Sequence, residues 1–163
     1  MPMRHVLEPW RDAPLPSLVE HLLEEYHLPT RRGLQQLDQL LRRVNTLHRG
    51  THGALLRQLG EVFAALRTEL EHHLGREEEL LFPLVREGHA VTAGTVLTAL
   101  DRDHVQTRKL LDRLVVMLDE NDGAEGIPPP VATVLEGLRN LEESLREHMA
   151  LEDELLFARI AAT

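Results

Sequence analysis

The sequence contains no cysteine among its 163 residues. Disulfides, zinc sites built on thiolates and iron–sulfur clusters held by cysteine are therefore excluded for this chain. Aromatic residues make up only 3% of the sequence, with one Trp and one Tyr, and β-branched residues form no long runs. A core must then be built chiefly from leucine, which is typical of an all-helical protein.

Long apolar segments are also missing. No run of about 18 apolar residues occurs, and the N-terminus has no apolar stretch of the kind found in signal peptides. The formal net charge of −9 opposes binding to nucleic acid or to an anionic membrane surface. We therefore expect a cytoplasmic protein with neither nucleic acid nor membrane as a partner.

Four segments carry apolar residues at helical spacing, at about residues 16–48, 54–85, 95–118 and 131–161. Short polar or glycine-rich stretches separate them. This pattern predicts an all-α fold, an up-down-up-down antiparallel four-helix bundle that occupies residues 15–163. Residues 1–14 are expected to form an irregular N-terminal arm whose Trp10 packs on the bundle. Pro29 and Pro83 fall inside predicted helices and should kink or loosen them locally.

A ten-residue motif occurs twice, at residues 73–82 and 148–157. Each copy reads His, three residues, Glu, two residues, Leu-Leu-Phe. Positions i and i+4 share one face of an α-helix, so each copy presents an imidazole and a carboxylate together. Two further histidines lie on the apolar stripes of the other two helices. Counting residues along each helix from the turns between helices places six side chains at the same height in the bundle, in one layer: His27, His73, Glu77, His104, His148 and Glu152.

Imidazoles and carboxylates buried at one level need a partner, because an unpaired buried carboxylate is strongly destabilising or becomes protonated. A metal is the natural partner, and imidazole with carboxylate suits iron or manganese better than structural zinc. Six ligands exceed what one tetrahedral ion needs. We therefore expect two metal ions bridged by Glu77 and Glu152, with two histidines on each ion. No catalytic residue can be assigned from the sequence.

The ordered set His27, His73-x3-Glu77, Asp103-His104 and His148-x3-Glu152 resembles hemerythrin-like (HHE) domains. More narrowly, it resembles the di-iron domain of the repair-of-iron-centres family, from about residue 17 to residue 160. The resemblance implies two iron ions, oxo- or hydroxo-bridged and held by the six residues, with manganese or zinc as substitutes. In that family the bundle follows a domain with a Cys pair, which has no counterpart before residue 15 here.

The resemblance also implies a small diatomic ligand, nitric oxide or dioxygen, and an electron donor that the sequence does not identify. The implied role is in nitrosative or oxidative stress, or in the repair of iron centres. One alternative is a non-enzymatic module that senses oxygen, redox state or iron, or that supplies metal. Another is a structural bundle whose six residues hold no metal. Enzymatic turnover and oligomeric state stay open.

Other polar residues near the predicted layer receive separate expectations. Tyr26 is expected in the core, with a hydrogen bond to a ligand or a redox role as the alternative. Asp103 could orient a metal ligand. Four side chains are expected to face solvent: His21, His72, Glu78 and Asp153.

Overall fold

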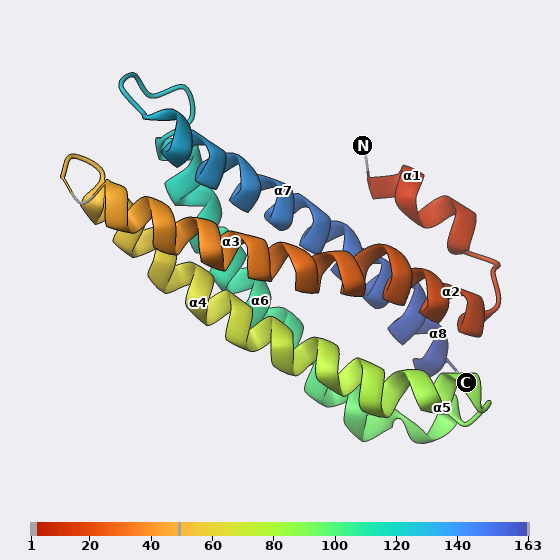
Figure 1. The fold of residues 1–163 in the computed structure, drawn as a ribbon. Coiled ribbons are helices and arrows are strands. Elements are labelled where there is room, and N and C mark those ends of the chain that lie inside the picture. The colour runs from red at the N-terminus through yellow and green to blue at the C-terminus, as the bar shows by residue number, and fades with distance from the viewer. Residues whose placement is uncertain (1–2, 49, 163) are drawn as a thin grey trace.

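The computed structural model describes residues 3–48 and 50–162, and most of these residues are helical. The long helices are arranged in four rods, each antiparallel to its neighbours in the chain (Figure 1). The rods are α2–α3 (Leu15–Leu22, Leu28–Leu47), α4–α5 (Gly53–Arg76, Phe82–Arg86), α6 (Gly94–Glu120) and α7–α8 (Pro129–Leu151, Ala158–Ala161). The predicted all-α four-helix bundle is confirmed.

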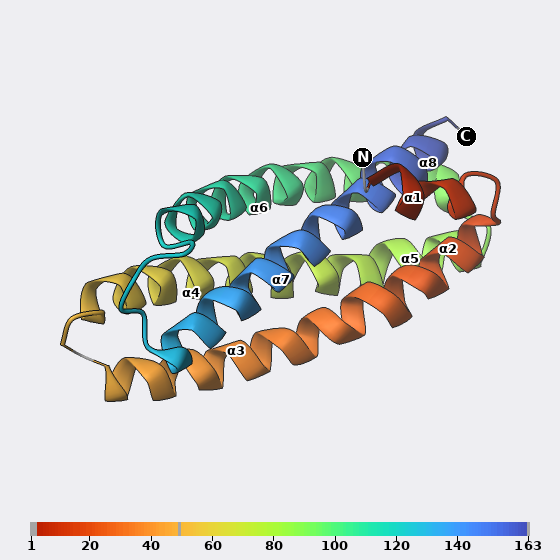
Figure 2. The same cartoon turned by 90° about the horizontal axis from the view of Figure 1, so that it is seen from above.

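The helices close into a ring around a shared interior. α3 contacts α4 and α7, while α6 contacts α4 and α7, so each long helix has two neighbours (Figure 2). A short 3-10 turn, Ala90–Thr92, lies in the connection between α5 and α6. Each helix can thus direct one stripe of side chains towards the other three.

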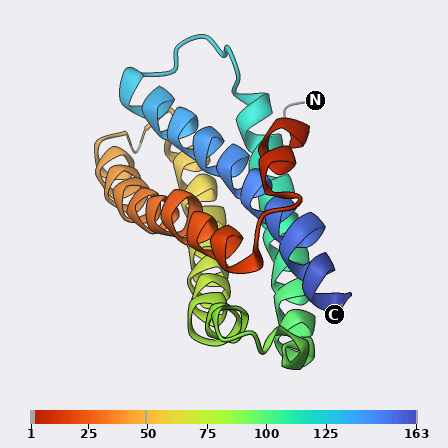
Figure 3. The ribbon, with the colours of Figure 1, turned by 90° about the vertical axis from the view of Figure 1, so that its right-hand side faces the viewer.

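The N-terminal arm was predicted to be irregular, and this is corrected by the structure. It forms a short helix, α1 (Met3–Leu7), followed by a 3-10 turn at Glu8–Trp10. Leu7 is only 3% exposed and joins the apolar core at that end of the bundle. Burial of this leucine explains why the arm is ordered against α7, where Figure 3 shows it beside the C-terminal helices.

Three of the rods contain a π-helical turn, at Leu23–His27, Glu77–Leu81 and Glu152–Phe157. Pro29 and Pro83 each follow one of these turns by two residues. Proline lacks an N–H, and its ring meets the carbonyl four residues earlier, which a wider turn avoids. The loosening predicted at the two prolines therefore takes the form of π turns, while the third turn forms without a proline.

The apolar core is divided into two clusters. Leu34, Leu70, Leu111 and Leu145 belong to the cluster nearer the α3–α4 connection, and Leu22, Leu81, Leu100 and Leu151 belong to the other. On each of the four rods, a short interval of the chain separates a residue of one cluster from a residue of the other. Buried polar side chains occupy that interval, so a polar layer lies between two leucine-rich ones.

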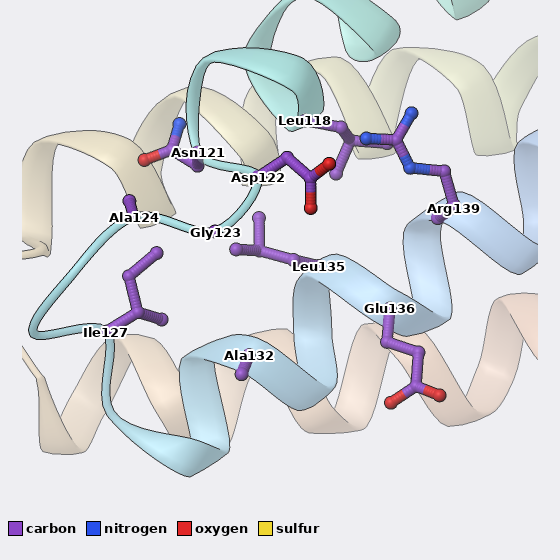
Figure 4. A pocket seen from close by; sticks show the side chains of 10 residues that line it. All are labelled: Leu118, Asn121, Asp122, Gly123, Ala124, Ile127, Ala132, Leu135, Glu136 and Arg139. Carbon is purple, nitrogen blue, oxygen red and sulfur yellow. The ribbon is translucent and has the colours of Figure 1, made fainter.

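One surface cavity lies away from the polar layer. A cavity of about 440 Å³ lies under the loop between α6 and α7, at the far end of the bundle (Figure 4). Arg139 lines it and pairs with Asp119 at 2.8 Å. The buried histidines do not line this cavity. Over the ranges 3–48 and 50–162, no helix combines the length and apolar character needed to cross a membrane.

Candidate metal centre

The four rods bring the six predicted side chains into contact within the polar layer. His27 ends the first π turn, while Glu77 and Glu152 each begin one. His73 and His148 lie one helical turn before these glutamates, and His104 comes from the middle of α6. None of the six residues is more than 2% exposed.

The six residues form two groups that share Glu152. One group comprises His27, Glu77, His148 and Glu152, and the other comprises His73, His104 and Glu152. Within each group, one potential ligand atom per residue lies within 4.8 Å of all the others. Oε2 of Glu77 lies 3.2 Å from Nε2 of both His27 and His73, so it also faces both groups. Two carboxylates thus lie between two pairs of imidazoles.

Several buried polar atoms of this layer have no hydrogen-bond partner. They include Nε2 of His27, Nε2 of His148, both carboxylate oxygens of Glu77 and Oε1 of Glu152. A buried polar atom left unpaired costs about 1–3 kcal/mol, so several of them together need an explanation. These atoms all belong to the group of His27, Glu77, His148 and Glu152, so a cation within that group would satisfy them at once. The donor set of imidazole and carboxylate oxygen fits iron, manganese or zinc.

The layer shifts the titration of its own residues. Burial lowers the pKa of His27, but the nearby carboxylates of Glu152, Glu77 and Glu78 outweigh it, and the pKa is raised to about 10. Asp153 and Glu152 likewise outweigh burial at His104 and raise its pKa to about 9. Burial alone would raise the pKa of Glu152, but the surrounding histidines hold it well below its usual range. The raised pKa values of these histidines mean that a metal has to compete with protons for the imidazole nitrogens.

Two acidic residues hold the outer ring nitrogens of two site histidines. Oε1 of Glu78 lies 2.9 Å from Nδ1 of His27, and Oδ1 of Asp153 lies 2.7 Å from Nδ1 of His104. An arginine supports each acid: Arg31 contacts Glu78 at 3.1 and 3.3 Å, and Arg108 contacts Asp153. Such a carboxylate keeps Nδ1 protonated and leaves Nε2 free to face a metal.

The expectation that Glu78 and Asp153 lie on solvated faces was therefore wrong. Each lies on a π turn and reaches a histidine of a neighbouring rod, a contact that a single-helix pattern does not contain. A signal was nevertheless present in the sequence. In both copies of the motif, the glutamate of the layer is followed at once by a second acidic residue.

Asp103 was considered as a residue that could orient a ligand, and it lies beside His73 rather than beside its chain neighbour His104. Its Oδ2 is 3.9 Å from Nδ1 of His73, beyond hydrogen-bond distance. Arg76 binds both oxygens of Asp103, at 2.6 and 2.7 Å. Among the described residues, no carboxylate contacts Nδ1 of His148. The four histidines are therefore not equivalent.

Aromatic rings pack against three of the four histidines. Phe82 lies against His27 with ring centroids 5.1 Å apart, and Phe157 stacks on His104 at 5.3 Å. These phenylalanines end the two motif copies, so the repeated Leu-Leu-Phe supplies the packing around the layer. Tyr26 stacks on His148 at 5.4 Å and is 8% exposed, as expected of a core residue.

Among the histidines outside the layer, two were expected to face solvent. His72 is exposed, as expected from its place next to His73 on the helix. His21 was expected in solvent, but it is half-buried and stacks on Trp10 with ring centroids 4.1 Å apart. The folded-back N-terminal segment covers it, which also confirms that Trp10 packs on the bundle.

Comparison with known proteins agrees with this arrangement. Residues 18–160 match the model of the hemerythrin HHE cation binding domain. The chain is 31% identical over 150 residues to an iron–sulfur cluster repair protein, YtfE, of Edwardsiella ictaluri, a match that covers 92% of this chain and 67% of the relative. It is 28% identical over 158 residues to the protein of the same name from Escherichia coli O157:H7, covering 94% of this chain and 69% of that one.

The family match spans the π turns and all six residues of the layer, and the first of these relatives supports it over nearly the whole chain. The chain therefore belongs to the hemerythrin HHE cation-binding domain family.

Proposed function

We propose that this protein is a non-haem di-iron protein that binds or reacts with nitric oxide or dioxygen. Its role would lie in the response to nitrosative or oxidative stress, or in the repair of iron centres. The observation that carries the proposal is the buried layer of unpaired imidazole and carboxylate atoms, in which Glu152 belongs to two separate groups. Membership of a cation-binding family supports it.

In this proposal His27 and His148 would hold one ion, His73 and His104 would hold the other, and the carboxylates of Glu77 and Glu152 would be shared between them. When bound, an iron pair supplies open coordination positions and electrons for a diatomic ligand. The chain itself fixes the ring orientations through the acids behind Nδ1 and packs phenylalanine rings around the layer, which limits access of water.

The printed name of the relatives, iron–sulfur cluster repair protein, favours a role in restoring damaged clusters. Such a role requires that iron be released to, or exchanged with, another protein. The alternative to an enzyme is therefore a module that supplies metal or senses oxygen, redox state or iron. The two differ in turnover, because an enzyme consumes many equivalents of its ligand and a binding module consumes about one for each site.

The first test is metal content by elemental mass spectrometry, on protein from iron-replete cells purified without a chelator. We expect close to two irons per chain. His73→Ala should lose metal, whereas His72→Ala, which changes the exposed neighbour on the same helix, should retain it. A single zinc, no metal, or equal loss in both variants would contradict the di-iron assignment.

The second test measures how much nitric oxide or oxygen the reduced, iron-loaded protein consumes in the presence of excess reductant. Many equivalents support the catalytic form of the proposal, and about one per site supports the binding module. Transfer of iron isotope to a nitric-oxide-damaged iron–sulfur protein then tests the repair role directly. No consumption and no transfer would refute both forms.

A further inference from the structure

A row of ring contacts connects the N-terminal segment to the buried layer. Trp10 stacks on His21, with centroids 4.1 Å apart and ring planes 18° from parallel. His21 meets Tyr26 edge-on at 5.7 Å, and Tyr26 stacks on His148 at 5.4 Å. The path begins at a half-buried tryptophan and ends at a fully buried histidine of the proposed site.

Two of the rings in this row are of types that can be oxidised by one electron. Trp10 and Tyr26 are the one tryptophan and the one tyrosine of the chain, and both side chains can lose a single electron. Phe82 and Phe157, the other rings against site histidines, resist oxidation and belong to the apolar core. The oxidisable rings therefore occur on the one histidine that has no carboxylate behind it in the described part of the chain.

Tertiary packing, rather than sequence spacing, places Trp10 next to the other rings of the row. α1 lies against α7, and Arg159 in the C-terminal helix α8 donates a hydrogen bond of 3.5 Å to the carbonyl oxygen of Trp10. The N-terminal segment (red in Figure 3) is thereby held beside the C-terminal helices. Stacking on His21 then fixes the indole at the outer end of the row.

We infer that Trp10, His21 and Tyr26 form a one-electron path between the surface and His148, through which a small soluble reductant returns electrons to the metal site. The use of this path in the cell rests on the proposed function. The electronic coupling between the rings does not, because it depends only on their contacts.

Each step of the path transfers one electron, and tyrosine also loses or regains a proton. When a peroxide has oxidised the iron-loaded site, Tyr26 would give that site one electron and its phenolic proton to water, and would become a neutral radical. Trp10 gives one electron through His21 to that radical, which takes up a proton and returns to tyrosine. A one-electron reductant of the enediol class, such as ascorbate, restores Trp10 and is itself oxidised by one electron. His21 only couples the two rings and changes no oxidation state.

The surroundings of Tyr26 suit this chemistry. A tyrosine phenol keeps its proton at neutral pH and loses it once the ring has given up an electron. Tyr26 retains 8% of its exposure, which leaves its proton an exit to solvent.

The path is tested by laser flash photolysis of the full chain, as purified and after loading with redox-inert zinc. A ruthenium tris-bipyridine photo-oxidant with a sacrificial acceptor oxidises the outer ring. Coupling between two rings is the same in both directions, so the path can be probed from the surface. With one Trp and one Tyr, each radical spectrum has one possible origin. We expect the tryptophan radical to decay as a tyrosyl radical appears.

The variants separate the path from simple packing. Tyr26→Phe should abolish the tyrosyl signal and lengthen the tryptophan radical lifetime several-fold, and Trp10→Leu should lower the tyrosyl yield several-fold. His21→Leu should slow the transfer, whereas His21→Phe, which keeps a ring, should restore part of its rate. His72→Leu, at an exposed histidine, should change nothing. A tryptophan radical with the same lifetime in wild type and in Tyr26→Phe would overturn the inference.

A second measurement starts from the site. Reduced, iron-loaded protein is treated with hydrogen peroxide, and oxidation of Trp10 is mapped by peptide mass spectrometry. Oxidised Trp10 is expected in the wild type, less in Tyr26→Phe, and little in the wild type with ascorbate. Equal Trp10 oxidation in all three samples would overturn delivery to the site. Radical transfer without iron binding would instead refute the proposed function and leave the ring path standing.

Discussion

Asp153→Asn tests most directly whether the acids behind the histidines serve the metal site. Oδ1 of Asp153 lies 2.7 Å from Nδ1 of His104, and Arg108 holds the other oxygen. The substitution keeps the size of the side chain and one oxygen, but it removes the negative charge and offers an amide N–H₂ to the ring or to the arginine. We expect His104 to lose its fixed orientation and part of its basicity as a ligand.

The size of the effect follows from the place of Asp153. Partners behind metal-binding histidines are worth about 10- to 100-fold in affinity, or about 1.4–2.7 kcal/mol. The side chain of Asp153 is 30% exposed, so solvent screens part of its charge. We therefore expect a loss at the lower end of that range, about 10- to 30-fold, on the ion held by His73 and His104. The other ion, held by His27 and His148, should be affected less.

The assay is competition for iron(II) or zinc with a chromophoric chelator, which resolves two binding events per chain. Glu154→Gln removes the same charge from the exposed neighbouring residue and is the matched control. Melting of the metal-free protein should change little, because a partly exposed ion pair contributes about 0–1 kcal/mol. If Asp153→Asn binds both ions within two-fold of the wild type, Asp153 does not act through His104. The assignment of His104 as a ligand would then also be in doubt.

Three further predictions follow from the geometry. Glu152→Gln and Glu77→Gln should each weaken binding of both ions, since both carboxylates lie between the two histidine pairs; two ions per chain retained in either variant by elemental analysis would contradict this. The folded-state pKa values of His27 (about 10) and His104 (about 9) lie above 6.5, so protonation stabilises the metal-free fold fully below pH 6.5 and this stability is lost as pH rises through 9 to 10. Urea titrations of metal-free protein should show that fall, and a flat profile would refute it. Gly60→Ala, inside α4 with nothing within 4 Å of the added Cβ, should raise the free energy of unfolding by about 0.5–1 kcal/mol, and a lower melting temperature would show hidden strain.

Much of the fold was accessible from the sequence because helical periodicity is a local property. Leucines at three- and four-residue spacing define the inner stripe of each helix without reference to any other helix. Short connections between consecutive helices then favour antiparallel packing. The same reasoning placed His27, His73, His104 and His148 at one level, because helix rise per residue is constant and distances from the turns can be compared.

The π turns show where local reasoning was partly sufficient. Pro29 and Pro83 indicated that the helical hydrogen bonds must be perturbed nearby, and they are. The turn at Glu152–Phe157 has no such marker, and no residue near it predicts the wider turn. Within the turn at Glu77–Leu81, Leu81 is buried while Leu80 stays 49% exposed.

Sequence by itself determined the helical class, the four-rod arrangement and the six side chains of the polar layer, because each depends on spacing along a single helix. Only the tertiary structure decided that Glu78 and Asp153 face inward to ring nitrogens, and that Trp10 and His21 continue a row of rings to Tyr26. Those contacts join residues far apart in the chain or on different rods. Their partners are set by how helices are rotated and offset against one another, which the periodicity of one helix does not contain.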